Sequence, residues 1–120
     1  MAVREANLLY GATTAEVSTF GVDGRGYVLK LFNKQFFVDE EPDRAVHEAA
    51  VLEALRGGSI PSPSPVGVDG DGSTCGVPAV LMTRLPGERG VRAAHAGEIV
   101  ETAVRMHAAD FTLPWTFRRY

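Results

Sequence analysis

The chain of 120 residues suffices for one domain with a single hydrophobic core, and its 45% hydrophobic and 22% charged residues are an ordinary globular composition. The formal net charge of -3 gives no general attraction to nucleic acid or to an anionic membrane, so we expect neither as a partner. Cys75 is the single cysteine, which excludes an internal disulfide and a multi-cysteine metal cluster and fits a reducing compartment.

The N-terminal residues carry no signal-peptide pattern and no apolar run long enough to span a bilayer. We therefore expect a cytoplasmic protein.

Three short strands are predicted in the first part of the chain, because apolar residues cluster or alternate there between turn residues. They are predicted at Leu8-Leu9-Tyr10, at residues 15–20 and at residues 27–32. Gly24 and Gly26 tolerate positive φ angles, which favours a hairpin between the second and third strands.

A helix is predicted from about Pro42 to Arg56. Pro42 suits the first helical position, and the acidic residues before it favour the positive end of the helix dipole. Gly57 suits the stop, because glycine readily adopts the left-handed conformation that ends many helices.

Two further strands are predicted at residues 66–69 and 77–82, on either side of a glycine-containing turn. The second of these strands is the more continuously apolar, and we expect it to be buried on both faces. From Glu98 to His107, apolar residues recur at helical spacing. The predicted fold class is α+β, with an antiparallel sheet of about five strands and one main packed helix.

Two charged residues interrupt apolar faces of these elements. Lys30 shares its strand face with Val28 and Phe32, where it is either a surface lysine whose stem crosses apolar surface or a functional cation. Glu48 lies on the helix face of Leu52, where it is either a solvated rim charge or the partner of a cation. Kinases use a strand lysine followed by a helix glutamate, because the glutamate holds the ammonium toward the nucleotide phosphates.

A turn between the first two strands is a candidate phosphate-covering loop. It contains Gly11, Thr13 and Thr14, and its backbone N–H groups could be donated to nucleotide phosphates. It has one glycine instead of the G-x-G-x-x-G array, so an ordinary hairpin turn with two solvated threonines is the alternative.

The segment after the last strand is a candidate adenine site. Backbone groups from Thr83 to Leu85 would pair with the adenine edge, and Met82 would cover its face, since nucleobase pockets are mostly apolar with a few polar anchors. The alternative is a plain β-turn after a core strand.

The succession of these features resembles the N-terminal lobe of the aminoglycoside phosphotransferase and choline kinase-like family, over nearly the entire chain. The pieces that carry the resemblance are Leu9-Tyr10-Gly11, Tyr27-Val28-Leu29-Lys30-Leu31, residues 48–55, Ile60-Pro61-Ser62-Pro63, residues 80–87 and residues 103–107. The resemblance implies a kinase-like lobe and hinge at residues 1–87, and a linker with the first helical segment of a truncated C-terminal lobe at residues 88–120.

By that resemblance Lys30 would contact the nucleotide phosphates, Glu48 would orient Lys30, and the backbone of Arg84 and Leu85 would hold adenine. The implied cofactor is ATP with Mg²⁺. His107 matches a histidine for which the resemblance implies a buried structural role.

The sequence contains no His-x-Asp-x-x-x-x-Asn catalytic loop, and without it and the metal ligands the phosphoryl group in transfer lacks electrostatic stabilisation. We expect the 120 residues alone not to catalyse transfer and to need a C-terminal kinase lobe, in cis or in trans. A fragment of a longer kinase is favoured. A split kinase and a non-catalytic module that binds a protein partner are the alternatives, and the phosphate acceptor stays open.

Overall fold

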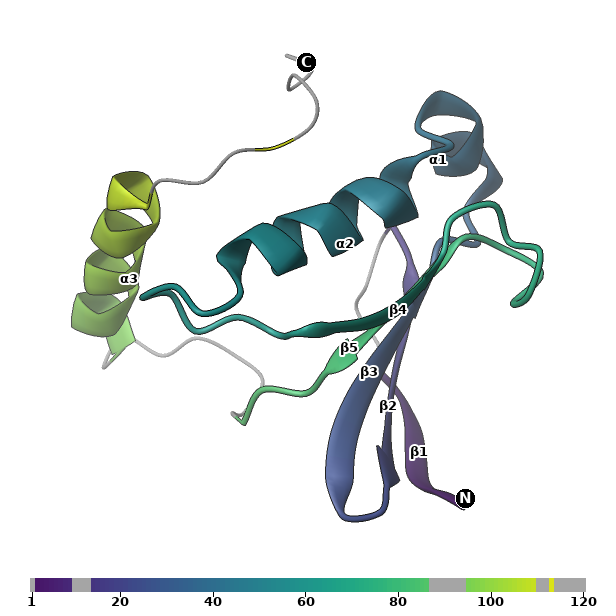
Figure 1. Ribbon diagram of the computed structural model, residues 1–120, viewed down its shortest axis with the longest axis horizontal. Coiled ribbons are helices and arrows are strands. Elements are labelled where there is room, and N and C mark those ends of the chain that lie inside the picture. The colour runs from purple at the N-terminus through teal and green to yellow at the C-terminus, as the bar shows by residue number, and fades with distance from the viewer. Residues whose placement is uncertain (1, 10–13, 87–94, 110–112, 114–120) are drawn as a thin grey trace.

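The computed structural model describes residues 2–9, 14–86, 95–109 and 113, which form a five-stranded antiparallel sheet and three helices (Figure 1). The strand order across the sheet is β1-β2-β3-β5-β4. The strands are β1 (Val3–Leu9), β2 (Glu16–Val22), β3 (Arg25–Leu31), β4 (Pro65–Asp69) and β5 (Ala79–Thr83), and the helices are α1 (Gln35–Glu40), α2 (Arg44–Leu55) and α3 (Ala96–Ala108). The predicted α+β class with five antiparallel strands is confirmed.

The hairpin between β2 and β3 sets the register of the sheet. Asp23 and Gly24 have φ angles of 52° and 78°, as expected for the two central residues of a tight hairpin turn that matches the strand twist. Residues directly opposite each other on adjacent strands share a face of the sheet. Lys30 lies opposite Val80 of β5, and Val28 lies opposite Met82, so these four side chains belong to one face.

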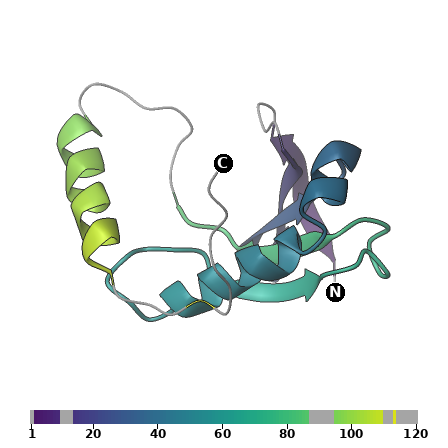
Figure 2. The ribbon, with the colours of Figure 1, turned by 90° about the horizontal axis from the view of Figure 1, so that it is seen from above.

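Helix α2 lies across that face and packs on β4 and β5 (Figure 2). Its face toward the sheet carries Ala45 and Leu52, which are 0% and 9% exposed. The core between helix and sheet consists of Ala15, Phe32, Ala45, Leu52, Val80 and Met82, with Val28 and Ala49 packed against it. Glu48 lies between Ala45 and Leu52 along the same side of α2, as the helical spacing predicted.

The strand predicted at residues 77–82 is β5, Ala79–Thr83, and three other elements differ from the prediction more clearly. Strand β1 starts at Val3, whereas the predicted strand started at Leu8. The alternation is hidden in the sequence because β1 is an edge strand with exposed polar residues. Its pairing with β2 also shifts register between Arg4 and Asn7. Helix α1 was not predicted, since six residues are too few to show a helical period. Helix α2 starts at Arg44 rather than Pro42, with Asp43 as the N-cap residue.

The connection from β4 to β5 is organised by one carboxylate. Asp69 accepts hydrogen bonds from the backbone amides of Gly72, Thr74 and Cys75 at 3.0, 2.9 and 2.6 Å. These bonds, first that of Cys75, lower the pKa of the Asp69 carboxyl from its usual 3.8. Desolvation and the nearby Asp69 carboxylate raise the pKa of the exposed Cys75 thiol from its usual value.

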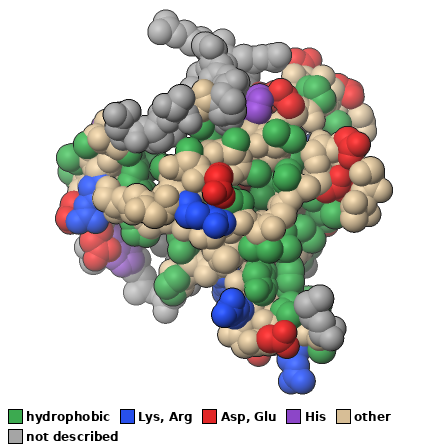
Figure 3. Space-filling view, viewed as in Figure 1, with side chains coloured by type: hydrophobic (Ala, Val, Ile, Leu, Met, Phe, Trp, Pro, Cys, Tyr) green, Lys and Arg blue, Asp and Glu red, His purple; other side chains and the backbone are tan. Residues whose placement is uncertain are grey.

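Helix α3 stands apart from the sheet in both ribbon views, and each of its residues is exposed (Figures 1 and 2). Ile99, Val100, Val104 and Met106 have 48–63% of their surface in contact with solvent. Hydrophobic side chains also reach the surface over much of the face seen in Figure 3. Val66 and Val68 of edge strand β4 are 52% and 50% exposed. Within the described residues, no helix has the length and apolar character needed to cross a membrane.

Candidate functional site

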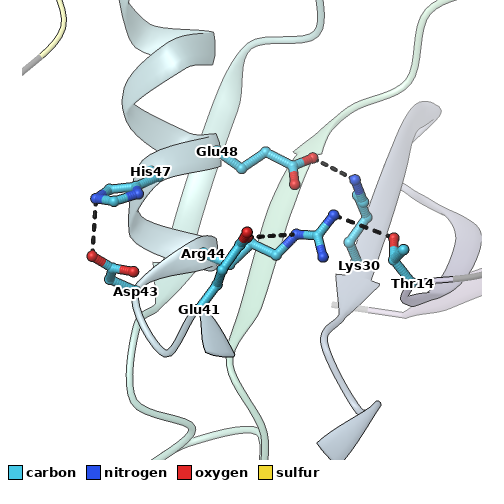
Figure 4. Close-up of polar contacts among 7 residues, drawn as sticks. All are labelled: Thr14, Lys30, Glu41, Asp43, Arg44, His47 and Glu48. Atoms are coloured by element: carbon cyan, nitrogen blue, oxygen red, sulfur yellow. Dashed lines mark hydrogen bonds and ion pairs between the residues drawn. The ribbon is translucent and has the colours of Figure 1, made fainter. Parts of the chain in front are cut away.

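The two charged residues singled out in the sequence meet in the structure. Lys30 Nζ lies 2.5 Å from Glu48 Oε1, which joins β3 to α2 across the edge of the core (Figure 4). Both side chains keep 27% of their surface exposed. The pair is therefore partly desolvated, yet open enough for Lys30 to meet a ligand.

Buried neighbours fix the stem of Lys30. The residue opposite it, Val80, is fully buried, and Phe32 on the same strand face is 2% exposed. Lys30 Nζ lies 5.6 Å from the centroid of the Phe32 ring, within the range of a cation–π contact. The ammonium is thus held between an aromatic ring and a carboxylate, at the border between the core and solvent.

Arg44, which the sequence analysis did not single out, extends the site toward Thr14, which precedes β2. Its Nη2 donates to Thr14 Oγ1 at 3.4 Å, its Cζ lies 5.5 Å from the Phe32 ring centroid, and its Nε lies 3.9 Å from Glu41 Oε2. The four-residue spacing from Arg44 to Glu48 was the available signal, because it places both on one helix face. His47 points to the other side of α2, where its Nε2 lies 3.1 Å from Asp43 Oδ2 (Figure 4).

The candidate adenine segment shows which backbone groups are already engaged. The Thr83 amide donates to Ser64 O at 2.9 Å, and Thr83 Oγ1 accepts from the Ser64 amide at 2.8 Å. The Arg84 amide donates to Gly26 O at 3.0 Å. Within the described part of the chain the Leu85 amide has no such partner, and Leu85 is 42% exposed. The Arg84 N–H is therefore already used within the sheet.

The other candidate residues fall in different places. Met82 is 6% exposed and belongs to the core, opposite Val28 on the face that carries Lys30. Gly11 and Thr13 lie outside the described residues, whereas Thr14 directly precedes the buried Ala15. His107, expected to be buried, is exposed, because α3 packs on no other described element.

Two grooves on the described residues are lined by neither Lys30 nor Glu48. One of about 360 Å³ lies between α1 and the β4–β5 connection, and one of about 240 Å³ lies beside the β2–β3 turn and includes Arg84. Among the residues that the structure describes, no three His, Cys, Asp or Glu side chains are grouped to hold a metal ion. The polar groups that the described site presents include the half-buried Lys30 ammonium and the backbone N–H of Leu85.

The sequence profile of the phosphotransferase enzyme family matches residues 11–119. Among solved structures, aminoglycoside phosphotransferase APH(4)-Ia is similar, with a TM-score of 0.62 and 19% identity over 91% of this chain and 36% of that one. A thermostable mutant of it, in ternary complex with ADP and hygromycin B, gives a TM-score of 0.67 at 17% identity, again over 91% and 36%.

A putative aminoglycoside phosphotransferase from Ralstonia eutropha JMP134 gives a TM-score of 0.60 at 19% identity, over 88% of this chain and 32% of that one. The chain thus spans about a third of the length of these proteins. No curated protein matches the sequence significantly.

Proposed function

The chain belongs to the phosphotransferase enzyme family, and from this premise we propose that it forms the ATP-binding lobe of a small-molecule kinase of the aminoglycoside phosphotransferase type. The observation that carries the proposal is the contact of Lys30 with Glu48. A strand lysine held by a helix carboxylate beside the core is the part of a kinase that meets the nucleotide phosphates. A mutant of one similar protein is known in complex with ADP, which supports a nucleotide as the ligand of this fold.

In this proposal Lys30 supplies a fixed positive charge to the phosphates. An ammonium on a flexible four-carbon stem would otherwise sample many positions, and ordering it on binding would cost conformational entropy. Glu48 reduces that cost because it already holds the ammonium on the α2 side. The remaining ammonium protons are available for phosphate oxygens, since a lysine has three donors.

The adenine edge would meet the Leu85 N–H and the Arg84 carbonyl. Both groups follow directly after β5, whose end is fixed by the Thr83 contacts with Ser64. One donor and one acceptor next to an apolar strand suit a nucleobase edge. Met82 would contribute apolar surface behind the base, and Thr14 would lie next to the phosphates.

Phosphoryl transfer would need more than this lobe. We assign residues 1–87 to the nucleotide-binding lobe with its hinge and residues 88–120 to a linker and the first helix of a C-terminal lobe. That lobe, in cis or in trans, would supply the groups that hold Mg²⁺ with ATP and that position an acceptor alcohol. The 120 residues by themselves would bind nucleotide without transferring phosphate.

The proposal is tested by titrating the chain with ATP and Mg²⁺ while recording backbone amide shifts. Shifts should concentrate at Lys30, Glu48 and Leu85 and leave the exposed helix α3 unchanged. Adenosine should reproduce the shift at Leu85 but not the shift at Lys30, since it lacks phosphates. A flat response at millimolar ATP would reject the proposal.

A further inference from the structure

The start of α2 is tied to the segment that precedes β2, and the nucleotide-binding proposal does not use this connection. Arg44 Nη2 donates to Thr14 Oγ1 at 3.4 Å, across 30 residues of sequence. Thr14 directly precedes Ala15, and Arg44 directly precedes Ala45, which are 3% and 0% exposed. Both ends of the contact are therefore anchored in the same core, while the contact itself lies at its border.

Arg44 and the Lys30–Glu48 pair share supporting groups. Arg44 and Glu48 are four residues apart on α2, so they lie one above the other on one helix face (Figure 4). The Arg44 Cζ and the Lys30 Nζ lie 5.5 and 5.6 Å from the centroid of the Phe32 ring. A shift of α2 that moved Arg44 away from Thr14 would move Glu48 relative to Lys30 as well.

We propose that Arg44 is a positioning residue that couples the Thr14 segment to the Lys30–Glu48 pair. The proposal rests on the nucleotide-binding function proposed above. When Thr14 is held in place beside a bound nucleotide, Arg44 holds α2 so that Glu48 keeps Lys30 oriented toward the phosphates. A ligand that orders the Thr14 segment would then also favour the orientation of Lys30, and the reverse, which amounts to a coupling free energy between the two positions.

The chemistry of arginine suits this role. A guanidinium has several donors in a fixed plane, so Nη2 can bond Thr14 while Nε stays near Glu41 and Cζ lies over the Phe32 ring. The Arg44 side chain is 30% exposed, and so the ion pair with Glu41 at 3.9 Å contributes little stability of its own. Loss of Arg44 should consequently change ligand affinity more than folding.

The test is a double-mutant cycle on ATP affinity, measured by calorimetry with Mg²⁺ present. The variants are Arg44→Gln, Thr14→Val and their combination, with Lys30→Met as the positive control. Arg105→Gln is the control for loss of an arginine charge elsewhere, because Arg105 contacts Glu101 at 2.9 Å on the exposed helix α3. The thermal midpoint of each variant and the ¹⁵N resonance of the Lys30 ammonium are recorded in parallel.

Each single variant should weaken ATP binding about fivefold, the scale of one partly exposed charged hydrogen bond. The double variant should be no weaker than the single variants, since both remove one contact. The Lys30 ammonium resonance should shift in both single variants, and Arg105→Gln should match the wild type. Additive losses, or a wild-type affinity for Arg44→Gln beside a weakened Lys30→Met, would overturn the coupling.

The failure of the nucleotide-binding function gives a different result. In that case the wild type does not bind ATP. The Lys30 ammonium resonance of the ligand-free chain then tests whether Arg44 couples Thr14 to Lys30. Shifts of that resonance in both Arg44→Gln and Thr14→Val would support the coupling of Thr14 to Lys30. An unshifted resonance in both variants would overturn it.

Discussion

The ammonium of Lys30 contacts the carboxylate of Glu48 at 2.5 Å, which connects the central strand β3 with the helix α2 that covers the sheet. A partly exposed ion pair contributes at most about 1 kcal/mol to stability, because water and salt screen it and two side chains lose freedom. Its value is geometric: the pair sets where a positive charge stands at the border of the core.

Replacing Glu48 by Gln should separate the small contribution of the ion pair to stability from its role in positioning the Lys30 ammonium. Gln keeps the size and helix propensity of the side chain but removes its charge. We expect the free energy of unfolding to fall by less than about 1 kcal/mol, while ATP affinity falls about threefold to tenfold because Lys30 is less well oriented. Urea unfolding and calorimetry measure the two effects. Glu53→Gln is the control, since Glu53 pairs with Arg56 on an exposed part of the helix.

Alternation and helical spacing are local patterns. The sequence alone therefore predicted the sheet, helix α2 and the faces on which Lys30 and Glu48 lie. It was insufficient where tertiary contacts decide. The edge strand β1 is stabilised by its pairing with β2, the engaged N–H of Arg84 depends on Gly26 in a distant hairpin, and Arg44 meets Thr14 only once α2 packs on the sheet.

Phe32 should be the costliest side chain of the site to truncate. It is 2% exposed and supports both Lys30 and Arg44, so Phe32→Ala leaves a cavity below the two cations. We expect a loss of about 3–5 kcal/mol in the free energy of unfolding, measured in urea. Val66→Ala is the control on an exposed strand position, and its loss should stay within about 0.5 kcal/mol. Equal losses for the two variants would contradict the assigned core.

The β4–β5 connection should loosen in acid. The pKa of the Asp69 carboxyl in the folded chain lies below its usual 3.8, so the unfolded chain binds more protons at this group. The ionised carboxylate therefore gives its full contribution to stability above pH 3.8. That contribution is lost as the pH falls through the folded pKa. Hydrogen exchange should show protected amides at Gly72, Thr74 and Cys75 at pH 5 and reduced protection below the folded pKa.

Asp69→Asn should reduce this protection already at pH 5, because an amide oxygen accepts these three bonds less strongly than a carboxylate does. Asp39→Asn is the control, since Asp39 bonds Gln35 of α1 and not this connection. If the three amides exchange alike in the wild type and in Asp69→Asn, the carboxylate does not organise the turn.

The adenine contact is tested at Leu85 by a change that removes its N–H donor. Proline has no N–H, so Leu85→Pro should weaken ATP binding about tenfold, whereas Leu85→Ala keeps the donor and should stay within about threefold. Calorimetry gives the affinities, and thermal unfolding verifies that both variants are folded. Equal affinities for the two folded variants would place the base elsewhere.

The most direct measurement is the ATP affinity of the wild type, Lys30→Met and Lys34→Met, in the presence of Mg²⁺. Both variants remove one positive charge from neighbouring parts of the chain, but only Lys30 contacts Glu48 beside the core. Lys30→Met should bind ATP at least about tenfold more weakly than the wild type, while Lys34→Met should bind like the wild type. Equal affinities for all three folded proteins would contradict the assignment of Lys30 to the nucleotide phosphates.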